Sequence, residues 1–108
     1  RKAQLYIRKH YASPIRLMDV AGFVGLTPVY LSARFKEETG IGFSDYLNQY
    51  RIEMSKKLLA ETDEKIVTIA HMTGYSNSRY YSRVFKNLEG IRPMDYRISV
   101  RKNGTEKD

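Results

Sequence analysis

The chain has 108 residues, which is enough for one domain, or for two small cores that share a helix. It contains no Cys, so disulfides and thiolate metal sites are excluded, while 42% hydrophobic and 29% charged residues are typical of a soluble globular protein. The formal net charge of +7 favours a polyanionic partner, which DNA, RNA and an acidic membrane surface would each satisfy. No apolar run reaches the roughly 18 residues of a bilayer span, so we expect a cytoplasmic protein that does not bind membranes.

Apolar residues recur at spacings of three and four along the whole chain, and no apolar-polar alternation lasts more than a few positions. This pattern predicts an all-α fold of about seven helices, with Gly and Pro supplying most of the breaks. The expected helices run from the first residues to about 11, and then over 17–24, 28–39, 43–60, 66–73, 77–89 and 93–99.

The ends of several helices are marked by capping residues. Thr27 is expected to cap the third helix with Pro28 at its first position, and Ser76 to cap the sixth. Residues 101–108 carry almost no apolar side chains, which predicts a disordered tail. The central helix is the longest, and its predicted apolar stripe comprises Tyr46, Leu47, Tyr50, Met54 and Leu58, with Leu59 as a further candidate.

An internal repeat relates residues 20–40 to residues 69–90. Three pairs lie 49 residues apart: Ala21 with Ala70, Gly25 with Gly74, and Thr27 with Ser76. Six later pairs lie 50 residues apart, so one residue is inserted at the second turn: Leu31 with Tyr81, Ser32 with Ser82, Phe35 with Phe85, Lys36 with Lys86, Gly40 with Gly90, and Tyr46 with Tyr96.

Each repeat has the pattern of a helix-turn-helix unit. The small Ala lets two helices approach closely, and the Gly in the turn can adopt a positive φ. If Leu31, Phe35, Tyr81 and Phe85 face the core, the opposite face of each second helix is free to enter a DNA major groove. We therefore predict two helix-turn-helix subdomains, 1–41 and 62–100, joined by a linker helix over 42–61.

Many residues inside and outside the repeat resemble one family. They are Tyr30-Leu31-Ser32, Phe35 to Gly40, Tyr46-Leu47, Arg51-Ile52, Leu58-Leu59, Ile69-Ala70, Gly74-Tyr75, Tyr80 to Lys86, Gly90, Pro93 and Tyr96-Arg97. Together they resemble the DNA-binding domain of AraC/XylS-type transcription regulators. The match covers nearly everything from Ala3 to Arg97.

The resemblance implies sequence-specific binding of double-stranded DNA, with two helices in adjacent major grooves. It also implies a transcription activator that contacts RNA polymerase. The first helix and the Phe35 to Gly40 stretch resemble two-component response regulators most, although sugar-sensing members share most of these residues. Because the chain starts at Arg1 without Met, we expect a fragment of a larger regulator, monomeric alone and dimeric through a missing N-terminal part.

The candidate base-reading residues of the second unit are those turned away from Tyr81 and Phe85, at the spacings of one helical face: Ser78, Arg79, Ser82 and Arg83. Each Arg could donate two hydrogen bonds to a guanine edge, and the alternative is a phosphate contact or a solvated charge.

The equivalent face of the first unit offers Pro28, Val29, Ser32 and Ala33. With one hydroxyl and no charge, this face is expected to recognise thymine methyl groups or groove shape. Ala33 departs from the family, which often has Arg there. The candidate phosphate contacts are Arg34, Lys36 and Lys86, with solvated surface charges as the alternative for the two Lys.

Five other positions bear on the site. Tyr30 and Tyr80 are expected to pack in the domain, with a phosphate contact as the alternative. Arg51 is expected to pair with a carboxylate inside the domain, with a DNA contact as the alternative. Arg16 and Arg92 replace the N-cap residues usual in the family, which predicts either frayed helices or cations near phosphate.

No catalytic, cofactor or metal site is predicted, because the only His residues are His10 and His71 and no Gly-rich loop or carboxylate cluster has catalytic spacing. The sequence therefore predicts no enzyme. The remaining alternatives are an RNA-binding module and a helical domain that docks on proteins. RNA modules mostly present aromatic side chains on strands, which the pattern does not predict.

Overall fold

The structure, a computed structural model, describes residues 1–106 and contains seven α-helices with no strand in that range. The predicted all-α fold is therefore confirmed. The helices are α1 (Lys2–His10), α2 (Leu17–Val24), α3 (Pro28–Thr39), α4 (Phe43–Glu61), α5 (Ile66–Met72), α6 (Ser78–Glu89) and α7 (Pro93–Glu106). The molecule is elongated, with principal extents of 49 × 25 × 21 Å.

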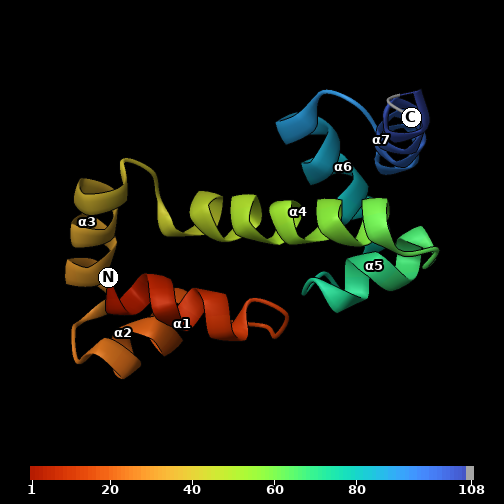
Figure 1. Cartoon of the computed structure of the whole chain (residues 1–108). Helices are drawn as coiled ribbons and strands as arrows, with labels where there is room; N and C mark the ends of the chain where they lie inside the picture. Colours follow the sequence, from red (N-terminus) through yellow and green to blue (C-terminus); the bar gives the residue numbers. More distant parts are fainter. Residues whose placement is uncertain (107–108) are drawn as a thin grey trace.

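The helix α4 joins the two halves of the molecule. Figure 1 shows α1, α2 and α3 gathered at one end of α4, and α5, α6 and α7 at the other. We call α1 to α3 with the start of α4 the first unit, and the rest of α4 with α5 to α7 the second unit. At about 1.5 Å per residue, the 19 residues of α4 span about 28 Å.

Each unit has its own hydrophobic core, and α4 contributes to both. In α4, Leu47 is buried in the first core and Ile52 and Leu59 in the second. The first core comprises Ala3, Ile7, Val20, Ala21, Leu31, Phe35, Phe43 and Leu47. The second core comprises Ile52, Leu59, Ile69, Ala70, Tyr75, Tyr81, Val84 and Phe85.

The residues of the internal repeat make equivalent contacts in the two units. Phe35 meets the ring of Tyr46 edge-on at 5.1 Å, and Phe85 meets Tyr96 in the same way at 5.6 Å. The glycines that end α3 and α6 both donate a 2.8 Å hydrogen bond back to a lysine carbonyl, from Gly40 to Lys36 and from Gly90 to Lys86. Helix α3 therefore packs against α4 in the same way as α6 packs against α7.

Buried arginines hold the connections between helices. Arg51 on α4 donates to the carbonyl oxygens of Tyr11 and Ser13, at 2.8 and 3.0 Å, in the loop between α1 and α2. Arg97 on α7 donates to the carbonyl of Leu59 in the last turns of α4, and to those of Thr62 and Glu64 in the loop between α4 and α5. Since both side chains are nine-tenths buried, these bonds supply the hydrogen-bond partners that the guanidinium groups need away from water.

The partner predicted for Arg51 was wrong. Its hydrogen bonds go to backbone carbonyls in place of a carboxylate, and its guanidinium lies over the ring of Tyr75 at 5.3 Å. Carbonyl dipoles and a ring face stabilise the cation without requiring a second charge to be buried.

The turn of the second unit also differs from its prediction. The residue that caps α6 is Asn77, whose side chain accepts hydrogen bonds from the amides of Arg79 and Tyr80 at 2.8 and 3.1 Å. Ser76 is therefore not the cap, and Thr27 corresponds to Asn77. The inserted residue consequently lies between Gly74 and the cap, in the turn itself.

Two predictions along the longest helices were also wrong. The fully buried residue near the end of α4 is Leu59, whereas Leu58 is only partly buried against the second core. Helix α7, expected to end near residue 99, continues to Glu106, and Arg101 on it bonds to Asp63 at 2.9 Å. Positions 101–106 of the expected tail are thus helical, and 107–108 lie outside the described residues.

The N-terminus of α2 shows how Arg16 is accommodated. The carboxylate of Asp19 accepts a 2.8 Å hydrogen bond from the backbone amide of Arg16 and lies 3.8 Å from its guanidinium. Asp19 thus supplies the half of a capping box that binds the amide of the N-cap residue, and its negative charge in the first turn suits the helix dipole.

Truncation of Leu59 should destabilise the second core. We expect Leu59→Ala to lower the free energy of unfolding by about 2–5 kcal/mol, because a fully buried Leu leaves a cavity. Leu58→Ala is the matched control, and its loss should be clearly smaller. Urea denaturation followed by circular dichroism measures both, and equal losses would contradict the burial described here.

Stability should also fall at high pH through Tyr81. Burial raises the pKa of the Tyr81 phenol to about 12, from an ordinary value of 10.0. The folded protein keeps this proton while the unfolded chain loses it, so the stabilisation is present below pH 10 and is lost as the pH rises toward 12. Urea denaturation at about pH 9 and about pH 11 should show a smaller loss for Tyr81→Phe than for the unchanged protein.

Candidate nucleic-acid interface

The exposed face of α3 is set by the two residues that anchor this helix. Leu31 and Phe35 are buried, so the residues on the other side of the helix face solvent. Thr27 caps the helix as predicted, because its hydroxyl accepts a 3.2 Å hydrogen bond from the amide of Tyr30. Val29 is 81% exposed, so nearly its whole side chain is accessible to a partner.

The four base-reading candidates of the first unit line one hollow. This hollow is lined by Leu17, Pro28, Val29, Ser32, Ala33, Lys36 and Glu37. The structure therefore brings Pro28, Val29, Ser32 and Ala33 together with Lys36, a candidate phosphate contact. Glu37 was missed by the sequence analysis, although its spacing of four residues from Ala33 would have found it. Leu17 comes from α2, and no helical spacing links it to α3.

The exposed face of α6 is cationic. Tyr81 and Phe85 are fully buried, while Arg79 and Arg83 are exposed and Ser78 and Ser82 are half-buried. Asn77 holds the first turn of the helix, so these side chains project from a fixed backbone. The face combines two guanidinium groups with two hydroxyls.

A second hollow lies beside this face and is rich in positive charge. It is lined by Ile66, Ser82, Arg83, Lys86, Arg92, Pro93 and Met94. Arg92, which replaces a usual capping residue, thus lies with Arg83 and Lys86 next to the first turn of α7. Three cations on one hollow fit a chain of phosphates better than any neutral partner.

The cations of both faces are available for a ligand. Within residues 1–103, Arg79, Arg83, Lys36 and Lys86 form no ion pair and no side-chain hydrogen bond. Lys56 offers a contrast, since its ammonium lies 3.2 Å from Glu53 and 3.1 Å from Glu89. Because these four cations have no partner among those residues, they can bind phosphates or base edges.

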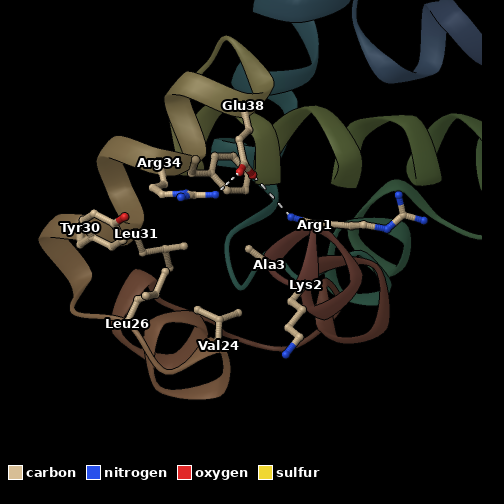
Figure 2. A pocket seen from close by; sticks show the side chains of 10 residues that line it. Arg1, Lys2, Ala3, Val24, Leu26, Tyr30, Leu31, Arg34 and Glu38 are labelled. Atoms are coloured by element: carbon tan, nitrogen blue, oxygen red, sulfur yellow. Dashed lines mark hydrogen bonds and ion pairs between the residues drawn. The ribbon is translucent and has the colours of Figure 1, made fainter.

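Arg34 lies apart from the hollow that contains Lys36. Figure 2 shows its side chain pointing toward Glu38, in a different hollow between α3 and the start of α1. The two side chains form a 2.8 Å ion pair, and the hydrogen bond from Arg34 lowers the pKa of the Glu38 carboxyl. A phosphate contact by Arg34 would have to compete with this pair.

The two tyrosines beside the reading faces are both about half exposed. Tyr30 lines the hollow of Arg34, whereas Tyr80 packs its ring against Tyr75 at 5.9 Å and lines a hollow with residues 15–17 of the first unit. Packing, the expected role, therefore describes Tyr80 well.

The described part of the chain has neither a cluster of metal ligands nor a helix that could span a membrane. Among those residues no three His, Asp or Glu side chains gather as ligands for a metal ion. None of the helices up to Glu106 combines the length and the apolar character that a bilayer span requires.

Comparison with known proteins identifies the family. A model described as a helix-turn-helix domain matches residues 20–99. The crystal structure of a Chromobacterium violaceum regulator with an AraC-type DNA-binding domain superposes with a TM-score of 0.86, at 26% identity over 92% of this chain and 88% of that one. The chain belongs to the AraC-type helix-turn-helix family.

Other known regulatory proteins are similar to this AraC-type domain over most of the chain. The regulatory protein PocR of Salmonella typhimurium is 37% identical over 103 residues, which cover 95% of this chain and 34% of PocR. The C-terminal domain of AraT, a response regulator from Geobacillus stearothermophilus, has a TM-score of 0.89 and 39% identity, covering 92% of this chain and 83% of that one. The chain thus spans about a third of PocR, and response regulators are among its relatives.

Arg83 is the residue of this AraC-type domain that best tests base reading. If it donates to a guanine edge, Arg83→Ala should weaken binding at the preferred site by about 1–3 kcal/mol and much less on random DNA. Competition binding with both duplexes measures the difference.

Lys86→Ala is the control from the same hollow. A phosphate contact there should weaken binding to both duplexes alike and lower the salt slope by about one. If Arg83→Ala behaved like Lys86→Ala, Arg83 would be a phosphate contact.

Proposed function

We propose that this AraC-type domain binds one duplex through both units at once, with α3 and α6 in successive major grooves on one side of the DNA. The observation that carries the proposal is the pair of exposed helix faces at equivalent positions of the repeat. The hollow beside α3 contains one cation, Lys36, and the hollow beside α6 contains Arg83, Lys86 and Arg92. The length of α4, about 28 Å, is comparable to the roughly 34 Å between major grooves one turn apart.

The two units contribute differently to specificity in this proposal. Arg79 and Arg83 on α6 donate hydrogen bonds to base edges, and Ser78 and Ser82 add donors or acceptors. On α3, Val29 and Ala33 stand at the places of these arginines and contact thymine methyl groups or sense groove shape. Lys36 and Lys86 bind phosphates on either side, and Arg34 does so if its pair with Glu38 opens.

The domain works, in our proposal, as the DNA-binding part of a longer transcription activator related to response regulators. PocR and AraT, which are named as a regulatory protein and a response regulator, support this assignment. RNA polymerase is the expected protein partner, and chromosomal DNA as ligand implies the cytoplasm. The domain alone is expected to be a monomer without enzymatic activity, while the longer protein dimerises outside this chain.

Selection of bound duplexes from a random library tests this function directly. We expect a conserved sequence with two blocks about one helical turn apart, bound less tightly as salt rises. RNA binding without a preferred duplex, or no salt-dependent affinity for DNA, would favour the RNA-binding or protein-docking alternatives.

Footprinting on the selected duplex tests the use of both units. Two protected major-groove patches about one turn apart are expected. A single short patch would show that only one unit binds.

A further inference from the structure

We propose that Arg51 is a positioning residue that fixes α6 relative to α3, and so sets how many base pairs separate the two half-sites that the protein accepts. This inference rests on the proposed binding of one duplex by both units. Arg51 lies near the middle of α4, between Leu47 of the first core and Ile52 of the second. It is the place on the shared helix where the two units come into contact.

On the side of the first unit, Arg51 holds the loop between α1 and α2. Its Nε donates to the Tyr11 carbonyl at 2.8 Å and its Nη2 to the Ser13 carbonyl at 3.0 Å. Two donors of one planar group fix both the position and the direction of this loop. The loop is therefore tied to one point along α4.

On the side of the second unit, the same guanidinium contacts the turn between α5 and α6. The ring of Tyr75 lies 5.3 Å from it, and the Tyr75 hydroxyl donates a 2.7 Å hydrogen bond to Asn48 on α4. Figure 1 shows the loop after α1 and the end of α5 meeting beside the middle of α4. One side chain thus touches both units.

The approach of the two units is close enough to require glycine at position 74. Gly74 has a φ of +99°, and a Cβ there would clash with the Tyr11 carbonyl oxygen and lie 2.7 Å from Arg51 Nε. Gly25, the equivalent residue of the first unit, has a φ of +77° but no atom within 4 Å of a Cβ built on it. Both glycines have a positive φ, but only Gly74 also lies in a close contact between the two units.

From Tyr75 the contact continues to the reading helix. Its ring packs against Tyr80 at 5.9 Å and Tyr81 at 5.4 Å, both in the first turns of α6. A packed series therefore runs from the Tyr11 loop through Arg51 and Tyr75 to α6. Because each base pair advances the groove by about 3.4 Å, a small rotation of α6 at this junction would shift its preferred half-site.

The first experiment measures the geometry of the units without DNA. The chain has no Cys, so spin labels can be placed at Glu37→Cys on α3 and Asn87→Cys on α6, both exposed, and the distance between them measured by pulsed electron resonance. We expect one narrow distance distribution for the unchanged protein and a broader or displaced one for Arg51→Lys. Lys keeps the charge but loses the planar pair of donors.

Arg97→Lys is the matched control, since Arg97 is equally buried and holds a loop within the second unit alone. Its distance distribution should remain narrow, even where stability falls as much as in Arg51→Lys. Should Arg51→Lys fail to fold, Gly74→Ala replaces it, with Gly25→Ala as the control that carries the same positive-φ strain.

The second experiment measures binding to the selected duplex with one base pair added or removed between its two blocks. For the unchanged protein and Arg97→Lys we expect such a change to weaken binding about tenfold or more. For Arg51→Lys, the loss of affinity caused by one base pair more or less should fall to about threefold or less, or the preferred spacing should change.

The outcomes separate the two proposals. Uniformly weaker binding by Arg51→Lys, with an unchanged spacing preference and a narrow distance distribution, would overturn the positioning role while leaving two-unit binding intact. A footprint with one patch would overturn two-unit binding, and the label distances would still decide whether Arg51 fixes the units.

Discussion

The structure depends on α4, which contributes buried side chains to two separate hydrophobic cores. A three-helix unit of about 40 residues buries too little surface to be stable alone, so each unit must share apolar area with a neighbour. Helix α4 supplies it, with Leu47 in one core and Ile52 and Leu59 in the other. Because both cores include α4, folding of either unit stabilises this helix and so favours folding of the other unit.

The sequence allowed most of the fold to be predicted, because its main constraints are local. Thr27, Pro28 and the paired glycines act on their own backbone or on the next turn, and their effects were correctly assigned. The apolar spacing placed Leu31, Phe35, Tyr81 and Phe85 in the cores for the same reason. The error in α4 arose because neighbouring helices decide which residue is buried: Leu59, and not Leu58, lies fully inside the second core. The error at the cap of α6 was local, because Ser76 and Asn77 are adjacent and both are capping residues.

The candidate site was predictable to a similar extent. Helical spacing found the faces of α3 and α6, including the difference between Ala33 and Arg83. It could not find Leu17 and Arg92, which reach the two hollows from outside α3 and α6. The pair of Arg34 with Glu38 has the four-residue spacing of one helix face, although Arg34 was predicted only as a phosphate contact. The carbonyl partners of Arg51 lie about 40 residues away in sequence, a contact that no local pattern encodes.

The second turn is one residue longer than the first, and it contains Tyr75, which contacts Asn48 and Arg51 on α4. The two halves are therefore not interchangeable, and no two-fold axis relates them. A molecule without such an axis has a head and a tail, so a single copy on DNA points along the duplex. Reversing its site would turn the whole protein to face the other way, whereas a symmetric dimer on a palindrome would be unaffected.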